Sequence, residues 1–314
     1  MQASIVIVSY NCWDKLRRCL ESVARHGSEV QHEVIVVDNA SVDDTPHKVD
    51  TEFPWVVLKA NTENLGFAAG VNQGVAKARG EFVLLLNPDC ETSAGTLDHL
   101  CRFLSDRPWV GACGPRLLDD TGAILKSCRT FPGLWTVFCE ASGLSQAMPG
   151  SRIFDSYRMG RWDYSRGRAV GWMSGAALAF RRKTWDAVGN FDEHFFIYAE
   201  ELDWQKRLGL AALDRWYVPE ATVLHHEGAS WGEMSLLRAL WSHWSLWYYF
   251  LKYHGRAYEA AVRTITACGA VARGMMWQVM GLSARRRDAA RAQAQLHWAV
   301  ARQCVSGKQP PRPG

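Results

Sequence analysis

Residues 4–9 read Ser4-Ile5-Val6-Ile7-Val8-Ser9, an apolar and β-branched run that is long enough for a strand buried on both faces. The segment 13–26 has the spacing of an amphipathic helix, and Glu33-Val34-Ile35-Val36-Val37-Asp38 predicts a second buried strand. Two more strands and one more helix continue the alternation, at 55–58, 81–86 and 67–79. Strands that alternate with helices favour right-handed crossovers, so we predict an α/β fold with a mostly parallel sheet flanked by helices.

The composition is globular and the charge is divided unevenly. The chain has 314 residues, of which 48% are hydrophobic and 22% charged, which excludes a disordered or fibrous protein. Residues 1–231 hold 24 Lys and Arg against 29 Asp and Glu, a net charge of −5, whereas residues 232–314 hold 12 against 3, a net charge of +9. We therefore predict two parts, a mildly acidic domain over 1–231 and a basic, Trp-rich extension over 232–314.

Three sequence patterns indicate the cellular compartment of the protein and whether it spans a membrane. The nine cysteines form no C-x-x-C pair, which argues against a zinc module or a disulfide framework and favours reduced thiols in the cytoplasm. No basic segment precedes the first predicted strand, so we expect no signal peptide. No run of 18 uncharged apolar residues occurs, so we expect no membrane-spanning helix.

Beyond residue 89 the alternation loosens. A helix is predicted at 93–105, a loop-rich stretch at 129–168 and, from residue 233 onward, helices followed by a disordered Pro-rich tail at 309–314. Five apolar residues of the extension recur at helical spacing: Leu237, Leu240, Trp244, Trp247 and Leu251. A second apolar group at 275–282 precedes Arg285-Arg286-Arg287. These helices either pack on the rest of the protein or lie on an anionic membrane surface, which amphipathic helices with Trp and Arg suit. No nucleic-acid-binding motif is present.

Polar residues follow three of the predicted strands. They form the segments Ser9-Tyr10-Asn11, Asp38-Asn39-Ala40-Ser41 and Asn87-Pro88-Asp89. Ligands of parallel sheets bind outside the carboxyl ends of the strands, where these segments are expected to lie. Asp89 suits a hard divalent ion, although its segment is also a typical turn. Asp38 suits a base or ribose hydroxyl, although Ser41 and Asp43 also suit capping of the next helix.

Three further segments carry residues that could bind a ligand or take part in catalysis. Residues 64–72 are rich in Gly and Ala and let a backbone approach a ligand, but no G-x-G-x-x-G occurs, which argues against a nicotinamide-dependent dehydrogenase. Tyr198-Ala199-Glu200-Glu201-Leu202-Asp203 places three carboxylates after an aromatic stretch, which favours either a solvated helix face or a cleft with a general base. His225 is either a structural histidine or, if it lies beside Asp89, a ligand.

The order of these motifs resembles a known family. The segments are Val6 through Asn11, Val36 through Ser41, Asn61 through Asn72, Leu84 through Asp89, Gly175-Ala176, Gly189 through Glu193, Tyr198 through Asp203 and His225 through Ser230. Together they resemble the family 2 glycosyltransferases, and within them the rhamnosyltransferase-like branch, over roughly residues 3–231. The resemblance implies the Rossmann-like GT-A fold, a nucleoside-diphosphate sugar donor, a divalent metal (Mn or Mg) and inversion at the anomeric carbon.

The resemblance also implies roles for individual residues. Donor binding falls on Ser9, Tyr10, Asn11, Asp38, Asn39, Ser41, Asn64, Gly66, Asn72 and Asn87. Asn87-Pro88-Asp89 stands for the family's D-x-D motif, with Asp89 as one metal ligand and His225, in the pattern His-x-x-Gly-x-Ser, as the other. The family's acidic motif usually reads Glu-Asp and here reads Glu200-Glu201. The catalytic base therefore falls on Glu201, with Glu200 and Asp203 as alternatives.

The function implied is an inverting, metal-dependent transfer of a sugar, with a rhamnose-like deoxysugar favoured, from a dTDP- or UDP-linked donor. The acceptor implied is a hydroxyl of a glycan, lipid-linked, in cell-surface polysaccharide synthesis. The protein would then be cytoplasmic and peripheral on the inner face of the cell membrane. The alternative function is a catalytically silent, sugar-nucleotide-binding or scaffold protein of the same fold.

Overall fold

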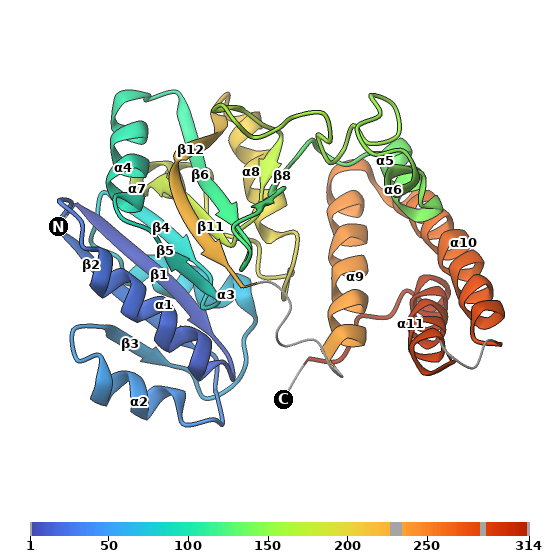
Figure 1. Ribbon diagram of the computed structural model, residues 1–314, viewed down its shortest axis with the longest axis horizontal. Helices are drawn as coiled ribbons and strands as arrows, with labels where there is room; N and C mark the ends of the chain where they lie inside the picture. The colour runs from blue at the N-terminus through green and yellow to red at the C-terminus, as the bar shows by residue number, and fades with distance from the viewer. Residues whose placement is uncertain (1, 227–233, 283–286, 313–314) are drawn as a thin grey trace.

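The structure, a computed structural model, describes residues 2–226, 234–282 and 287–312 of the chain. In Figure 1, the sheet and the helices that cover it form the left part of the molecule, and a separate layer of helices forms the right part. The predicted boundary between residues 231 and 232 lies outside the described residues, as do Gly228 and Ser230 of the predicted histidine motif and Arg285 and Arg286. The division into two domains at that boundary stays a prediction.

The first half of the sheet is parallel and follows the predicted alternation. Its strands are β1 (Ala3–Ser9), β2 (His32–Asp38), β3 (Val57–Ala60) and β4 (Phe82–Leu86), in the order β3-β2-β1-β4. The helices between them are α1 (Trp13–His26), α2 (Thr45–Glu52) and α3 (Phe67–Lys77). The register pairs Ser9 with Asp38, so the last residues of β1 and β2 lie side by side.

The second half makes the sheet mixed. β11 (Ala177–Arg181) lies between β4 and β6 (Val110–Leu118) and is antiparallel to both. β12 (Asp214–His225) runs parallel to β6 and antiparallel to the short edge strand β5 (Cys90–Thr92). The remaining short strands are β7 (Ile124–Leu125), β8 (Cys128–Arg129), β9 (Arg168–Ala169) and β10 (Trp172–Met173). The covering helices of this half are α4 (Thr96–Asp106), α7 (Arg182–Val188) and α8 (Glu200–Leu210).

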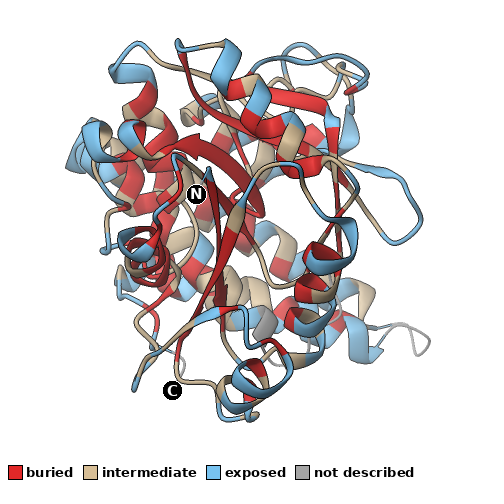
Figure 2. Cartoon of the chain, turned by 90° about the vertical axis from the view of Figure 1, so that its left-hand side faces the viewer, coloured by how far each residue is buried: buried red, intermediate tan, exposed pale blue. Residues whose placement is uncertain are grey.

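Each face of the sheet has its own hydrophobic core, because side chains alternate along a strand. Ile5 and Ile7 pack with α1 on one face, and Val6 and Val8 pack with α3 on the other. Figure 2 shows the strands as the most buried part of the molecule. Such burial stabilises the fold by about 25 cal/mol for each Å² of apolar surface removed from water.

The extension forms a helical layer with a third core. Its helices are α9 (Met234–His254), α10 (Arg256–Met280) and α11 (Arg287–Ser306), joined by α5 (Leu134–Ser142) and α6 (Leu144–Ala147). Helices α5 and α6 lie within the stretch that the sequence predicts as loops. Helix α5 packs along α10, and this tertiary contact, which the local sequence does not show, stabilises it. Trp247 of the predicted stripe is buried in this core, whereas Leu251 is exposed.

The Pro-rich end of the chain is ordered as far as residue 312, which corrects the prediction of a disordered tail for that part. Pro310 is buried, and the indole N–H of Trp241 on α9 donates a hydrogen bond to the carbonyl oxygen of Pro311 over 3.1 Å. The guanidinium of Arg312 lies over the ring of Phe196. Within the described residues, no helix is both long enough and apolar enough to span a membrane.

Candidate active site

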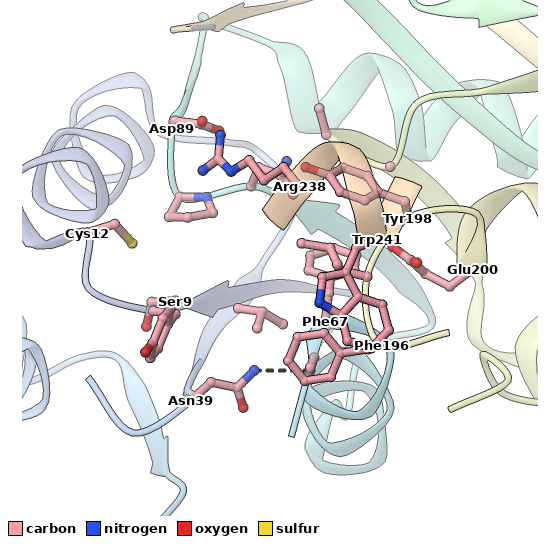
Figure 3. Close-up of a pocket in the computed structure, with 18 of the residues that line it drawn as sticks. Ser9, Cys12, Asn39, Phe67, Asp89, Phe196, Tyr198, Glu200, Arg238 and Trp241 are labelled. Atoms are coloured by element: carbon pink, nitrogen blue, oxygen red, sulfur yellow. Dashed lines mark hydrogen bonds between the residues drawn. The ribbon is translucent and has the colours of Figure 1, made fainter. Parts of the chain in front are cut away.

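A cavity of about 540 Å³ opens at the carboxyl ends of β1 and β4. Its lining comes from the residues after β1, the start of α3, the residues after β4, the start of α8 and the first turns of α9. Figure 3 shows that Asp89, Arg238, Tyr198 and Glu200 extend around one space although they come from distant parts of the sequence. Eleven predicted site residues line it: Ser9, Tyr10, Asn11, Asn39, Asn64, Gly66, Asn87, Asp89, Glu200, Glu201 and His225.

Asp38 and Ser41 lie behind the cavity wall and do not line it. The Asp38 carboxylate accepts hydrogen bonds from the Ser9 hydroxyl (3.0 Å) and from the Ser41 amide (2.8 Å) and hydroxyl (2.6 Å). The amide of Asn11 in turn donates to the Ser41 hydroxyl over 2.8 Å. These bonds join the loops after β1 and β2, so both residues fix the shape of this wall of the cavity.

Ser41 also does not cap the next helix. Helix α2 begins later than predicted, after Asp44 in a left-handed conformation. The Asp43 carboxylate accepts hydrogen bonds from the amide (3.3 Å) and hydroxyl (2.5 Å) of Thr45. Asp43 therefore satisfies the first amide of α2, whereas Ser41 lies before the helix and its hydroxyl oxygen accepts the Asn11 N–H instead.

The start of α3 is fixed against the segment before α8. Asn39 donates from its amide nitrogen to the carbonyl oxygen of Gly66 over 3.0 Å. Gly66 has a φ of 92°, and a Cβ atom there would lie 2.5 Å from the carbonyl oxygen of Phe196. Only glycine fits both the conformation and the contact.

Asn72 lies outside the cavity, contrary to the predicted donor contact. Its amide nitrogen donates to the Phe191 carbonyl over 3.0 Å and to the Glu193 carboxylate over 2.8 Å. Its amide oxygen accepts the Phe191 N–H over 3.0 Å. Both ends of this buried side chain are used, so Asn72 connects α3 to the segment at 191–193 rather than to a ligand.

Asp89 and His225 form the group that suits a metal ion. The antiparallel pairing of β12 with β5 places His225 opposite Cys90, and His225 Nε2 lies 3.3 Å from Asp89 Oδ1. Lys15 Nζ lies 3.7 Å from Asp89 Oδ2. Burial alone would raise the pKa of Asp89, but the hydrogen bond and charge of His225 and the charge of Lys15 lower this pKa below its usual value. Asp89 is therefore ionised at neutral pH, as a metal ligand must be.

The donor set fits a hard divalent ion. Asp89, Cys90 and His225 each offer one ligand atom within 4.8 Å of the others. The buried Cys90 thiol donates to the carbonyl oxygen of Ala176 over 3.5 Å, which leaves one carboxylate and one imidazole. An ion with so few protein ligands completes its coordination with water or substrate phosphates, as Mg²⁺ commonly does.

Glu200 and Glu201 begin α8 on the opposite side of the cavity. The two residues before them, Tyr198 and Ala199, both have positive φ values (68° and 67°), a strained conformation that is typical of functional sites. Burial raises the pKa of Glu200 well above its usual value, and the Glu201 carboxylate raises it further. Burial also raises the pKa of Glu201. Among the described residues, neither Oε2 atom has a hydrogen-bond partner, so both remain available to a ligand.

Asp203 does not belong to this cavity, which corrects its prediction as an alternative base. Its fully buried carboxylate lies 3.0 Å from Arg207 Nε and 2.7 Å from Lys252 Nζ, and it accepts a hydrogen bond from the Tyr253 hydroxyl over 2.9 Å. Asp203 therefore anchors α8 to α9. These contacts with α8 and α9 take up the Asp203 carboxylate, and it does not line the cavity.

Sequence reasoning missed several residues that line the cavity. Lys15 comes from α1, and Leu237, Arg238 and Trp241 come from α9. Arg238 carries no local signal, because it is one of twelve basic residues in 232–314. Trp241 stands next to the predicted apolar stripe, and its ring lies 4.8 Å from that of Phe196.

Comparison with known proteins agrees with this geometry. The sequence model of the family described as "Glycosyl transferase family 2" matches residues 4–143. The N-acetylglucosaminyl-diphospho-decaprenol L-rhamnosyltransferase of Mycobacterium tuberculosis is 33% identical over 270 residues, which cover 82% of this chain and 87% of the relative.

Two solved structures show the same fold at low sequence identity. The mannosyltransferase PcManGT from Pyrobaculum calidifontis, solved with GDP-Man and Mn²⁺, has a TM-score of 0.57 at 18% identity and covers 98% of this chain and 88% of its own. TarS from S. aureus has a TM-score of 0.52 at 17% identity, with coverages of 98% and 92%. The chain therefore belongs to glycosyltransferase family 2, within its rhamnosyltransferase-like branch, and is a glycosyltransferase with the GT-A fold.

Proposed function

We propose that the protein transfers a rhamnose-like deoxysugar from a dTDP- or UDP-linked donor to a hydroxyl of a lipid-linked glycan, with inversion at the anomeric carbon. The observation that carries this proposal is that one cavity holds Asp89 and His225 on one side and the buried pair Glu200 and Glu201 on the other. Inverting displacement needs both, because charge develops on the leaving diphosphate while a proton leaves the acceptor. The M. tuberculosis relative, whose name specifies a lipid-diphosphate acceptor and rhamnose, supports the choice of substrates.

Asp89 and His225 would hold the divalent ion, Mn²⁺ or Mg²⁺. When bound, such an ion stabilises the negative charge that the leaving nucleoside diphosphate gains. The Mn²⁺ in the mannosyltransferase structure supports this choice of ion. On the donor side, Ser9, Tyr10 and Asn11 would face the nucleotide, and Asp38 and Ser41 would hold their loop in place from behind.

Glu201 would act as the general base. The acceptor oxygen forms its bond to the anomeric carbon while the bond from that carbon to the phosphate oxygen breaks, and the acceptor proton passes to the Glu201 carboxylate. A base with a raised pKa accepts this proton more readily near neutral pH than an ordinary carboxylate does. Burial and the charge of Glu201 raise the pKa of Glu200 in turn, and two adjacent buried carboxylates titrate as a pair.

The acceptor proposed here requires work at a membrane surface, on the inner face of the cell membrane. The end of α10 carries exposed apolar side chains: Met275 is 53%, Val279 67% and Leu282 80% exposed. Arg287 and Arg291, both exposed, follow at the start of α11. An apolar ridge beside basic residues suits an anionic bilayer, where each basic residue contributes about 1 kcal/mol.

Vesicle binding tests the membrane proposal. Full-length protein should co-sediment with anionic vesicles at low salt and less so at high salt, and Val279→Glu should weaken binding. Leu210→Glu, at an exposed apolar residue of α8, is the matched control. Equal binding to neutral and anionic vesicles, or none to either, would contradict the proposal and leave the extension a packing role.

A donor screen tests the enzyme proposal against a catalytically silent binding protein. Purified protein is incubated with a panel of dTDP- and UDP-sugars and Mn²⁺, without acceptor, and released nucleoside diphosphate is measured. Slow release from one donor is expected, because water replaces the missing acceptor. Binding of a donor without any release, both without and with a lipid-linked acceptor, would favour the silent protein.

A further inference from the structure

Arg238 on α9 is a charged residue of the cavity for which no role has yet been given. It lies beyond residues 4–143, which the family model matches, and it belongs to the basic extension. Figure 3 shows its guanidinium pointing from α9 across the cavity toward Asp89. The extension thus contributes a side chain to the end of the cavity at which the metal ligands lie.

The charges at this end favour an anion with more than one negative charge. Lys15 and Arg238 are both basic side chains that line the cavity, as does His225. The ionised Asp89 carboxylate lies 3.3 Å from His225 Nε2 and 3.7 Å from Lys15 Nζ. With the proposed divalent ion, these basic side chains place several positive charges at one end of the cavity. A nucleoside diphosphate carries the complementary negative charge.

Arg238 also lies close to the acceptor side. Burial raises the pKa of the Tyr198 hydroxyl, and the charge of Arg238 offsets part of that rise, so the guanidinium lies near the segment that precedes α8. Figure 3 shows the Tyr198 ring beside Arg238. A side chain that extends from Tyr198 toward Asp89 lies between the proposed metal ligands and the proposed base, where the donor's sugar-bearing phosphate would bind.

We propose that Arg238 binds the phosphate that carries the sugar, so that α9 completes the donor site. A planar guanidinium donates two parallel N–H bonds to phosphate oxygens, a geometry that lysine lacks. That phosphate gains negative charge as its bond to the sugar breaks, so the interaction strengthens in the transition state. The assignment rests on the proposed function, because it requires a nucleoside-diphosphate donor.

The test compares nucleoside diphosphates with monophosphates. Binding of UDP, dTDP, UMP and dTMP to full-length protein in Mn²⁺ is measured by calorimetry for wild type, Arg238→Gln and Arg238→Lys. We expect Arg238→Gln to weaken binding of the preferred diphosphate at least about tenfold, because hydrogen bonds to charged groups are worth about 1.5–3 kcal/mol. Monophosphate binding should change less than about twofold, since the second phosphate is absent. Arg256→Gln, at an exposed arginine outside the cavity, should change neither.

Arg238→Lys keeps the positive charge but removes the two parallel N–H bonds of the guanidinium, so it separates the two contributions. It also keeps the test decisive if Arg238→Gln fails to fold. It should retain part of the preference for the diphosphate. An equal loss for both nucleotide classes, or no loss for either, would overturn the assignment. If wild-type protein binds no diphosphate, the proposed function itself fails, and the assignment fails with it.

Discussion

Glu201→Gln is the substitution that separates the proposed base from its neighbours. It removes the carboxylate that would accept the proton and keeps the size of the side chain. General-base catalysis contributes about 10²–10⁴-fold, so transfer should slow at least about 100-fold, which corresponds to about 2.7 kcal/mol of transition-state stabilisation. Donor affinity should change little, because Glu201 lies opposite the metal ligands.

Glu200→Gln should have a much smaller effect. A base works only when it is deprotonated, so the raised pKa of Glu201 makes transfer fall, as the pH drops, at a higher pH than a carboxylate with the usual pKa of 4.5 would. Burial raises the pKa of Glu201, whereas burial and the charge of Glu201 together raise that of Glu200, so Glu200 keeps its proton to a higher pH than Glu201 does. Glutamine resembles this protonated form, so Glu200→Gln should leave the acid limb of the pH profile close to that of wild type. The rate well above the limb should stay within about tenfold of wild type, because the base is intact.

The assay is the initial rate of nucleoside-diphosphate release with acceptor present, measured across pH for wild type, Glu201→Gln, Glu200→Gln and Glu201→Asp. Glu201→Asp restores the family's usual residue and should keep most of the rate. A crippled Glu200→Gln beside a mild Glu201→Gln would move the base to Glu200. Two mild variants would refute the assignment of a carboxylate base at this turn.

The remaining predictions concern the metal, the anchor of α8 and the pH dependence of stability. Asp89→Ala should abolish transfer and Mn²⁺ binding, measured by calorimetry, while thermal unfolding stays close to that of wild type; full turnover in excess chelator would contradict the metal site. Asp203→Ala should lower the free energy of unfolding by about 3 kcal/mol in urea titrations, because it removes the buried carboxylate that Arg207, Lys252 and Tyr253 share, and an unchanged stability with lost transfer would return Asp203 to a catalytic role. Because the pKa of Glu200 is raised in the folded protein, its contribution to the free energy of unfolding is fully present below its unfolded pKa and is lost as pH rises through its folded pKa. Glu200→Gln should therefore reduce the loss of stability with rising pH, measured by urea unfolding at several pH values. A loss of unchanged size would show that Glu200 is not its source.

The elements that the sequence predicts best are the buried strands. Residues 4–9, 33–38 and 81–86 match β1, β2 and β4 to within one residue at each end, because a strand buried on both faces needs an unbroken apolar run. The mixed order of the sheet was not predictable in this way. β11 pairs with β4 across about ninety residues of sequence, and nothing within either strand specifies that partner.

In the candidate site, too, the residues in sequence motifs were predictable, whereas those placed by tertiary packing were not. Asp89 and His225 were predicted as a pair because the family motifs assign both, and the pairing of β5 with β12 brings them together. Asp203 was weighed as a base because it is close to Glu201 in sequence, but its carboxylate is bound by Lys252 and Tyr253 of α9, a tertiary contact that the local sequence does not specify. Arg238 lines the cavity only because α9 packs against it, and no local sequence pattern predicts that packing.

The most direct test of the central claim is one transfer reaction read by its product. Full-length protein is incubated with a dTDP- or UDP-linked deoxyhexose, an N-acetylglucosaminyl-diphosphoprenol acceptor and Mn²⁺, and the glycolipid is analysed by mass spectrometry and by NMR of its anomeric centre. We predict a lipid extended by one deoxyhexose with inverted configuration, no product in excess chelator, and recovery on addition of Mn²⁺. Product with retained configuration, or equal product in excess chelator, would contradict the account.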